Sequence, residues 1–561
     1  MTVVIHLHPR AARILTVTGL ALTLLSPFLP WTQSTTYPGN LTLAGYPGGS
    51  QLVTLVTGLL AAYFAVAALG GDRTALLAPA GAVRALRAAS LAALTTTLIT
   101  VVAIAITLGG AINIEPGGFL AAAGAVLLAA GAHTLPDDAV PDRPTGRRGL
   151  PRAAEVALIT AVFLAAMFIL TYGITTESAQ DFLAFLPAAG LGMRALVVSG
   201  LGRRLSEINR RNRIAVAAAG LAAALVFPFT QTGDQYTAIA ANILVFATVA
   251  LGLNIVVGLV GLLDLGYVAF LGTGAYTAAL VSGSTFSTFH MEPLPFWAAA
   301  LLSMAVSLVA GVVIGAPTLR LHGDYLAIVT LGFGEIFRIT VNNLDGTSGP
   351  SLTNGPNGIN SVPNISLFGF DFGRPHTVLG VEFGRFANYY VLLLAVTALV
   401  VFVYARAGDS RVGRAWIALR EDEKAATAMG IEGFRYKLLA FGLGASLAGL
   451  AGSVMAHLQT NAVPDNYKFA DTAPPNSAFL LAAVVLGGMG TISGPLVGAA
   501  LLYLIPAKFE FFSKYQMLLF GLALILMMRF RPEGLVPDRK HQLEFHEEEP
   551  GHHPQATEAT A

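Results

Sequence analysis

The sequence has no cysteine, few charged residues and no Gly-Lys dipeptide. The absence of cysteine excludes disulfides, thiolate nucleophiles and cysteine-ligated zinc or iron–sulfur sites. Without a Gly-Lys pair there is no Walker A loop, so we expect no ATP hydrolysis by this chain alone. The formal net charge is +1, which gives no basic field for long-range attraction of nucleic acid, and nucleic-acid binding is excluded.

Charged residues make up only 12% of the 561 residues, whereas soluble domains contain about a quarter. Hydrophobic residues make up 55%, and the mean hydropathy is +0.67. About 20 apolar residues span the hydrocarbon core of a bilayer, and about 16 such stretches lie between residues 12 and 530. The sequence therefore predicts an all-α polytopic membrane protein.

Arginine clusters alternate along the first half of the chain and predict its topology. They mark every second connection, at Arg10, Arg84, Arg152 and Arg210, while the connections between them hold acidic residues without Lys or Arg. Cytoplasmic loops are enriched in Lys and Arg, so we expect both termini on the cytoplasmic side. The same alternation places 343–384 and 459–476 outside and 407–437 inside.

Composition shifts at the basic run 203–213, which separates two hydrophobic halves. We interpret residues 1–205 as an N-terminal transmembrane extension of unknown role and 206–540 as the core. The basic run could also anchor anionic membrane lipid, although a topology signal is the stronger interpretation. Residues 541–561 predict a disordered cytoplasmic tail. Its histidines are better explained by a solvated tail than by a metal site: His541, His546, His552 and His553.

Three ionisable residues near or within apolar stretches are candidates for a pathway: Asp264, Glu335 and Arg338. Glu335 and Arg338 lie three residues apart, so they share a helical face and can pair. Intramembrane ionisable groups are costly unless they are paired or face an aqueous path. A structural ion pair that fixes helix packing is the alternative.

A glycine-rich stretch at 345–359 lies outside by the predicted topology. Its glycines and prolines predict an irregular loop. The residues of interest are Asn354, Gly355, Pro356, Asn357 and Gly358. Their backbone amides could meet a ligand or a docking protein, and a tight re-entry turn between spans is an equal alternative.

The connection 406–437 carries seven basic and five acidic residues. Arg414 to Met429 contains no Pro or Gly, which predicts one surface helix that ends at Gly430. An apolar stripe is predicted at Ala415, Leu419, Ala426 and Met429, beside a charged patch at Arg420, Glu421, Asp422, Glu423 and Lys424. We interpret this segment as a docking surface for a cytosolic partner, and a plain amphipathic connector is the alternative.

Two patterns of small residues follow. The span 438–458 carries Ala445, Gly449 and Ser453 at small-xxx-small spacing, which predicts a packing face either within the chain or against another subunit. Gly487, Gly488 and Gly490 interrupt an apolar stretch and predict a broken helical hairpin near 477–508. This break is a candidate pathway element, and a simple hairpin turn is the alternative.

Six strings carry a resemblance to a known family: ALGLNIVVGLVGLLDLGYVAFLGTGAY (250–276), LRLHGDYLAIVTLGFGEIFRI (319–339), TNGPNGI (353–359), VGRAWIALREDEKAATAMGI (412–431), VVLGGMGTISGPLVGA (484–499) and RPEGLVP (531–537). They resemble the permease subunit of branched-chain amino acid ABC importers, the LivM type. The resemblance covers the region 214–540. Members of the family carry shorter N-terminal segments, so residues 1–205 are a departure.

The resemblance implies several partners in a bacterial plasma membrane. They are a second, LivH-type permease, two cytosolic ATPase subunits that bind ATP and Mg²⁺, and an extracytoplasmic substrate-binding protein. No cofactor is expected in this chain. The resemblance also implies that 412–431 is the ATPase-coupling helix. Glu423, Ala425, Ala426 and Gly430 match the importer pattern Glu-Ala-Ala followed after three residues by Gly, and Lys424 offsets that pattern by one position.

We therefore predict a permease subunit of an ABC importer for branched-chain or hydrophobic amino acids, with no covalent chemistry of its own. A permease for urea or short amides is an alternative, because the binding protein usually sets selectivity in such systems. An ion-coupled secondary carrier is less supported, since it would need several midspan carboxylates and no docking helix. A membrane-embedded enzyme would need His and carboxylate groups clustered at one membrane face.

Overall fold

The computed structural model describes residues 8–33, 41–43, 48–70, 78–137, 151–231, 233–288, 292–320, 324–347, 349–378, 381–471, 476–508, 514–531 and 533–536. Within these ranges, eleven helices are long and apolar enough to cross a membrane, or twelve if a bent pair, Leu201–Arg211 with Ile214–Thr230, forms one span. Four more apolar helices are shorter. The prediction of an all-α polytopic membrane protein is confirmed. The predicted count of about 16 segments includes these shorter helices as well as full-length spans.

The chain forms two compact units. Unit 1 comprises Met1–Ala240, Thr377–Phe383 and Ala507–Glu510, and unit 2 comprises Ala241–His376, Gly384–Pro506 and Phe511–Ala561. The domain limits predicted from the sequence, 205/206 and 540/541, stay predictions. The tail 541–561 and its histidines lie outside the described residues.

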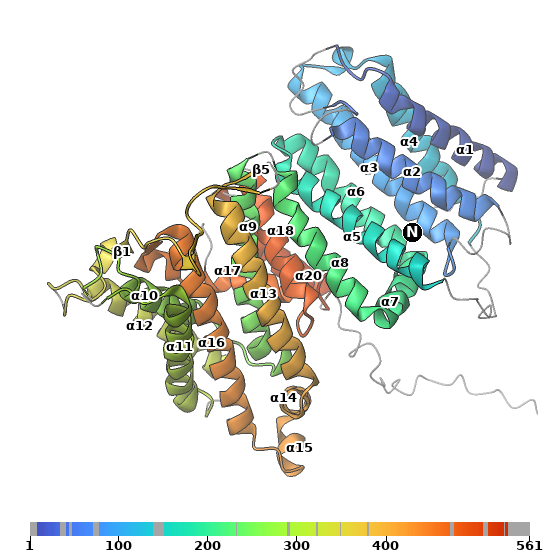
Figure 1. Ribbon diagram of the computed structural model, residues 1–561. Coiled ribbons are helices and arrows are strands. Elements are labelled where there is room, and N and C mark those ends of the chain that lie inside the picture. Colours follow the sequence, from blue (N-terminus) through green and yellow to red (C-terminus); the bar gives the residue numbers. More distant parts are fainter. Residues whose placement is uncertain are drawn as a thin grey trace, which may run out of the picture. The chain divides into compact units, whose positions relative to one another are not determined.

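Unit 1 is built from helices that run along one another (Figure 1). Its elements are α1(Pro9–Leu25), η1(Ser26–Phe28), α2(Ser50–Leu69), α3(Ala82–Thr107), η3(Ala111–Asn113), α4(Pro116–Thr134), α5(Arg152–Thr175), α6(Ala179–Val198), α7(Leu201–Arg211), α8(Arg213–Val226) and η4(Phe227–Thr230). Helix α3 packs against α2, α4 and α6, and α1 packs against α4.

Small residues allow the helices of unit 1 to approach closely. A Cβ atom on Gly124 would lie 2.8 Å from the Leu22 Cβ atom, and one on Gly131 would lie 2.6 Å from the Thr16 amide nitrogen. The core around α3 consists mainly of alanine, with Phe64, Val83, Leu86, Leu128 and Leu135 as its larger members. Close backbone approach replaces large side chains as the source of packing contact in this unit.

Unit 2 begins within α9(Asp234–Asn254), which continues into a π-helical turn, η5(Ile255–Leu259). The helices that follow are α10(Val268–Val281), α11(Phe296–Thr318), α12(Asp324–Asn343), α13(Arg385–Asp409), α14(Arg411–Glu421), α15(Glu423–Ala428), α16(Gly433–Gln459), α17(Ser477–Gly487), α18(Ser493–Lys508) and α20(Gln516–Phe530). The short elements of unit 2 are η6(Gly355–Asn357), β1(Ile359–Asn360), β2(Ser366–Leu367), β3(Phe370–Asp371), β6(Asn461–Ala462) and η7(Pro464–Tyr467), whereas β4(His376–Val378) and β5(Val381–Phe383) belong to unit 1 apart from His376. The strands form three two-stranded sheets, β1 with β6, β2 with β3 and β4 with β5. The first two pairs are antiparallel.

Helix α16 is the centre of unit 2, with α10 and α11 packed along it. A Cβ atom on Gly274 of α10 would lie 2.7 Å from the carbonyl carbon of Gly449. Ser303 of α11 donates a hydrogen bond to the Gly274 carbonyl at 2.9 Å, which ties the third helix to this contact. The predicted small-residue face of 438–458 therefore packs within the chain.

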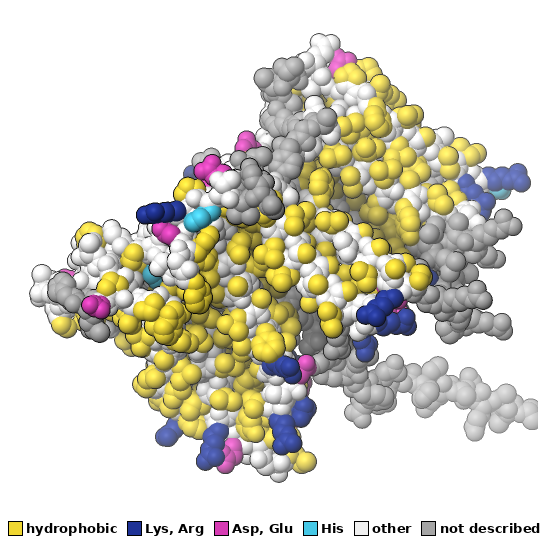
Figure 2. All heavy atoms as spheres, in the orientation of Figure 1, with side chains coloured by type: hydrophobic (Ala, Val, Ile, Leu, Met, Phe, Trp, Pro, Cys, Tyr) yellow, Lys and Arg dark blue, Asp and Glu magenta, His cyan; other side chains and the backbone are white. Residues whose placement is uncertain are grey.

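Hydrophobic side chains cover the sides of the helices, and Lys and Arg gather near helix ends (Figure 2). On α11, for example, Leu301, Val309 and Val313 are more than half exposed. Such exposure suits contact with lipid or with another membrane subunit.

We expect Gly449→Ala to destabilise the protein by about 1–3 kcal/mol, because the added methyl group would enter a filled contact between three helices. The measurement is the midpoint of thermal unfolding in mild detergent. Gly332→Ala in α12 is the matched control, since no atom lies within 4 Å of a Cβ atom built there. Equal midpoints for the two variants would contradict the packing described for α16.

Candidate functional site

The connection between α13 and α16 of unit 2 contains two short helices, α14 and α15, and the prediction of one helix from Arg414 to Met429 is wrong. Asp422 separates them with an extended backbone, φ −152° and ψ 106°. Its carboxylate accepts hydrogen bonds from the amides of Lys424 and Ala425 at 2.8 and 3.0 Å. Aspartate is among the best N-cap residues, so it ends one helix and begins the next.

The apolar stripe is only partly as predicted. Ala415, Leu419 and Ala426 are buried, whereas Met429 is 84% exposed. Gly430 follows with φ +88°, the left-handed conformation that ends α15 as predicted. The tip of this segment therefore presents Met429 outward.

Most acidic residues of the predicted charged patch are held within the chain. Glu421 pairs with Arg420 at 2.8 Å, and Glu423 pairs with Lys437 of α16 at 2.6 Å. Arg414, Asp422 and Lys424 also have exposed side chains. We define the docking tip as residues 424–430, which are exposed apart from Ala426.

Two contacts fix α14 to the membrane helices of unit 2. Trp416 is fully buried, and its indole nitrogen donates a hydrogen bond to the Tyr436 carbonyl at the start of α16, 2.8 Å away. Arg420 donates from Nη1 to the carbonyl oxygen of Gly258 in η5, also at 2.8 Å. A displacement of α14 therefore acts directly on the end of α9.

The break between α17 and α18 occurs where the glycines predicted it, at residues 488–492. The side chain of Asn254 in α9 forms hydrogen bonds with the residues of this break. The Asn254 Oδ1 atom accepts from the Gly490 amide at 2.9 Å, and Nδ2 donates to the Thr491 carbonyl at 2.7 Å and to the Tyr404 hydroxyl at 2.9 Å. Asn254 is completely buried. Its amide thus joins α9, α13 and the broken hairpin.

The other side of the break is closed by the chain that follows α20. The amides of Leu535 and Val536 donate to the carbonyls of Leu486 and Gly487 at 2.8 and 2.9 Å. Gly488 has φ +124°, and a Cβ atom there would collide with Val536. Only glycine fits this position, which explains one of the three predicted glycines physically.

Sequence reasoning missed Asn254, Gly258, Tyr404 and Trp416. Asn254 does carry a signal, because it is the one amide side chain within the apolar run 245–263. Its partners do not, since they lie more than 140 residues away along the chain.

The intramembrane ionisable candidates do not share one site. Glu335 and Arg338 pair as predicted, with Arg338 Nε donating to Glu335 Oε1 at 3.0 Å, and the Glu335 side chain is 47% exposed. Asp264 is 1% exposed and accepts from the Gly266 amide at 2.9 Å. It is enclosed by protein, whereas the ion pair lies on an open face of α12.

The Glu335/Arg338 pair belongs to a wider charged region, because α12 contacts η7. Beside η7, Lys468 pairs with Asp465 at 3.3 Å and with Asp471 at 3.4 Å. Hydrogen bonding to Asp465 and the nearby charges of both carboxylates raise the pKa of Lys468, so it stays charged at neutral pH.

The glycine-rich stretch 353–359 forms a turn tied to the strand pair β1 and β6. Asn354 has φ +61° and donates from Nδ2 to the Gly358 carbonyl at 3.1 Å. Ile359 then pairs with Ala462, and Asn360 with Asn461. Gly355 and Gly358 are buried, while Pro356 and Asn357 are exposed at the tip.

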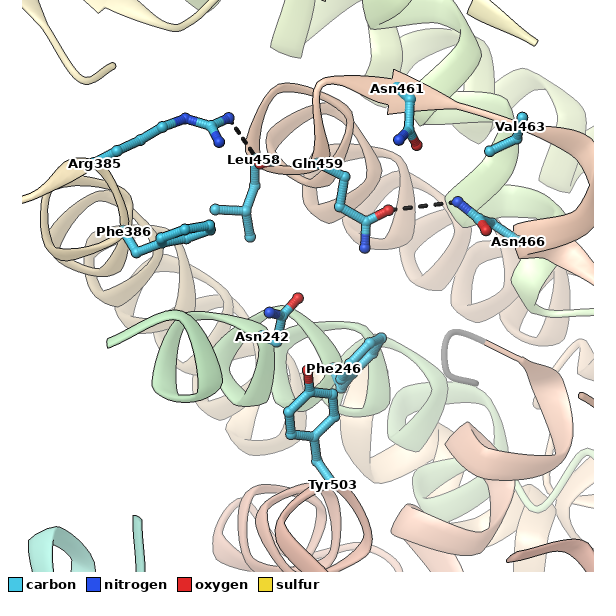
Figure 3. Close-up of a pocket in the computed structure, with 10 residues that line it drawn as sticks. All are labelled: Asn242, Phe246, Arg385, Phe386, Leu458, Gln459, Asn461, Val463, Asn466 and Tyr503. Atoms are coloured by element: carbon cyan, nitrogen blue, oxygen red, sulfur yellow. Dashed lines mark hydrogen bonds between the residues drawn. The ribbon is translucent and has the colours of Figure 1, made fainter. Parts of the chain in front are cut away.

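A cavity of about 520 Å³ lies next to this sheet pair (Figure 3). Helices α9, α13, α16 and α18 contribute to its walls together with β6 and η7. It is lined by Asn242, Phe246, Arg385, Phe386, Leu458, Gln459, Asn461, Val463, Asn466 and Tyr503. Figure 3 shows the amides of Asn242, Gln459 and Asn466 around one open space, with aromatic rings on its other sides.

The cavity combines polar and apolar walls. Gln459 Oε1 accepts from Asn466 Nδ2 at 3.5 Å, and Arg385 Nη2 donates to the Leu458 carbonyl at 2.8 Å. No Asp or Glu is among the described residues that line it. No group of three or more His, Asp or Glu side chains placed to hold a metal ion occurs in the described part of the chain.

Comparison with known proteins identifies related sequences. The family model described as "branched-chain amino acid transport system / permease component" matches residues 235–528. The high-affinity branched-chain amino acid transport system permease protein LivM of Salmonella typhimurium is 40% identical over 337 residues, which cover 58% of this chain and 75% of LivM. The Escherichia coli LivM is 39% identical over 339 residues, with the same coverage of both chains.

A second kind of permease is more distantly similar. The LivH permease protein of Salmonella typhimurium is 24% identical over 306 residues, which cover 52% of this chain and 91% of LivH. No solved structure gives a significant match. The matched family region begins at residue 235, so unit 1 up to α8 lies outside it.

We expect Asn254→Ala to expose the break between α17 and α18 to solvent exchange. Loss of the bond to the Gly490 amide should speed hydrogen exchange in a peptide covering 488–492 about fivefold, as for a hydrogen bond worth about 1 kcal/mol. Hydrogen–deuterium exchange with mass spectrometry measures this change.

Thr248→Ala is the matched control. Its hydroxyl bonds to the Thr397 hydroxyl at 2.7 Å, which also joins α9 to α13 but does not touch the break. Equal exchange at 488–492 in both variants would show that Asn254 does not hold the break.

Proposed function

This chain belongs to the branched-chain amino acid transport system permease family, and from this membership we propose that it is the LivM-type subunit of an ABC importer. It is a multi-pass membrane transport subunit. We propose that it takes up branched-chain or other hydrophobic amino acids and that partner subunits bind ATP and Mg²⁺. In this proposal the chain performs no covalent chemistry, and its termini are cytoplasmic.

The observation that carries the proposal is the continuous link from the docking tip to the helix break. Arg420 holds Gly258 of η5, Asn254 lies immediately before η5, and the same Asn254 holds Gly490 and Thr491. An ATPase that moves α14 would thus move the end of α9 and the broken hairpin together. Packed elements joined in this way have few alternative arrangements, which suits switching between two access states.

The docking tip suits a cytosolic ATPase. Met429 is an exposed flexible apolar side chain, and Lys424 adds an exposed positive charge within the same tip. An apolar anchor within a polar rim is the usual composition of an interface centre. The Glu423/Lys437 pair and the Asp422 cap keep α15 rigid while the tip is engaged.

The cavity in Figure 3 supports an amino acid substrate over urea. A zwitterionic amino acid with an apolar side chain needs polar groups at one end and apolar walls at the other. The amides of Asn242 and Gln459 and the rings of Phe246 and Phe386 supply both kinds of wall. Few convergent polar groups within an apolar pocket are typical of small-molecule sites. Urea or a short amide has no apolar part to occupy the aromatic side.

A cation-coupled carrier is the second candidate, and the cavity disfavours it. Such a carrier needs carboxylates at the ion path. The described lining of the cavity contains a cation, Arg385, and no carboxylate, and Asp264 is enclosed elsewhere.

The remaining partners are assigned to particular faces. We propose that the second, LivH-type permease covers α12, where Glu335, Ile336 and Ile339 are exposed, because a half-exposed carboxylate facing lipid would be costly. We propose that the substrate-binding protein docks on the outer loop tip at Pro356 and Asn357, beside the cavity.

We expect the double variant Lys424→Ala, Met429→Ala to reduce the stimulation of ATPase activity by loaded binding protein at least about tenfold, since it removes the exposed anchor of an interface. Reconstituted proteoliposomes and co-purification of the ATPases provide the measurement. Phe368→Ala removes an exposed apolar side chain from the turn between β2 and β3 and serves as the control. Full stimulation with the double variant would refute the docking assignment.

We expect Gln459→Leu to lower the transport rate about tenfold without loss of ATPase subunits, because a polar group of the cavity is replaced by an apolar one of similar size. Uptake of radiolabelled leucine into proteoliposomes measures this effect. Gln235→Leu is the matched control, since Gln235 is exposed at the start of α9 and does not line the cavity. Unchanged uptake would remove the cavity from the proposed pathway.

A further inference from the structure

Unit 1 contains a cavity of about 370 Å³, lined by residues from the start of α3 and from the ends of α4 and α6. Four basic side chains line it together with an apolar floor: Arg84, Arg87, Ala88, Leu91, His133, Leu191, Arg194 and Val198. This volume lies within the range of about 300–1,000 Å³ typical of small-molecule sites. The proposed transport mechanism uses none of these residues.

Hydrogen bonds join the three helix ends to one another. The Ala80 amide, just before α3, donates to the Ser199 carbonyl just after α6, at 2.9 Å. Arg87 of α3 donates from Nη2 to the Leu135 carbonyl after α4 at 2.7 Å and from Nε to the Ala132 carbonyl at 3.2 Å. The cavity is therefore a built junction of three apolar helices at one end of their spans.

The charges in the cavity are only partly neutralised. Arg87 forms an ion pair with Asp137 at 2.7 Å. Arg84 and Arg194 form no ion pair with any described residue, and both are exposed. Two cations thus remain available at the mouth of the cavity, and the first turn of α3 adds the positive end of a helix dipole.

The surroundings of these cations are apolar. Leu91, Leu191 and Val198 form the floor of the cavity. On α6, Met193 and Val197 are 60% and 61% exposed, one residue away from Arg194 and Val198. A ligand with a negative head and long apolar chains would satisfy both the cations and this outer face.

We propose that this cavity binds the phosphate head group of an anionic phospholipid, with the acyl chains along the outer face of α6. Arg84 and Arg194 donate charge-assisted hydrogen bonds to the phosphate, while Arg87 is held by Asp137 and shapes the wall. A basic pocket between membrane helices at the end of their spans is the geometry expected for such a lipid. A free phosphate would gain nothing from the apolar floor.

The test uses the full-length chain with its co-purifying subunits in mild detergent. After delipidation, phosphatidylglycerol or phosphatidylcholine is added in mixed micelles, and native mass spectrometry counts the bound lipid. The wild type is expected to retain phosphatidylglycerol in preference to phosphatidylcholine. The double variant Arg84→Gln, Arg194→Gln is expected to bind phosphatidylglycerol at least about tenfold more weakly, for the loss of two charge-assisted bonds.

The control variant Arg10→Gln, Arg13→Gln removes the same charge from exposed positions on α1 outside the cavity. It is expected to bind phosphatidylglycerol like the wild type. Equal weakening by both double variants would overturn the proposal. So would equal binding of the two lipids by the wild type, or displacement of phosphatidylglycerol by inorganic phosphate, which would indicate a soluble anion. The last two measurements need no variant, so they decide the proposal even if the double variant fails to fold.

Discussion

Backbone polar groups inside a bilayer need hydrogen-bond partners from the protein itself, and the interruptions in the helices of unit 2 depend on this constraint. The break at 488–492 is satisfied by the amide of Asn254 on one side and by the backbone of Leu535 and Val536 on the other. The π-helical turn η5 is satisfied in part by Arg420. Each interruption therefore has a partner in an element far away along the chain.

The same requirement joins the proposed site to the rest of the unit. If the backbone groups of the break formed hydrogen bonds only with one another, the break would bend as a hinge without moving other helices. Because Asn254 serves the break and Arg420 serves the adjacent turn, the surface helix α14 and the broken hairpin share the end of α9. Tight contacts between small residues, such as Gly274 against Gly449, make α10 and α16 one body that cannot absorb such a movement by bending.

Local chemistry explains what the sequence could predict. Apolar length predicts spans, and the glycines at 487–490 predict the break, because both depend on residues that are neighbours in the chain. The single helix predicted for 414–429 was wrong because Asp422 has acceptable helix propensity but a stronger preference for the N-cap position. The prediction that Met429 belongs to the buried apolar stripe was wrong for the same reason, because the stripe was placed on one continuous helix and Asp422 divides that helix.

Long-range pairing explains what the sequence could not predict. Asn254 was visible as an isolated amide in an apolar run, but nothing near it indicates Tyr404 or Thr491 as partners. The cavity beside β6 draws its lining from six separate elements, and no local pattern assembles Asn242 with Gln459 and Tyr503. The Glu335/Arg338 pair was predictable because three residues separate its members.

The closure of the break by Leu535 and Val536 also orders events during synthesis. The ribosome synthesises α17 and α18 before α20 and the residues after it. The carbonyls of Leu486 and Gly487 therefore lack their hydrogen-bond donors, the amides of Leu535 and Val536, until that later segment is made. The hairpin completes its fold only when the chain beyond α20 returns to it, with Gly534 passing against Gly488. A chain truncated before Gly534 would therefore leave the carbonyls of Leu486 and Gly487 without these donors.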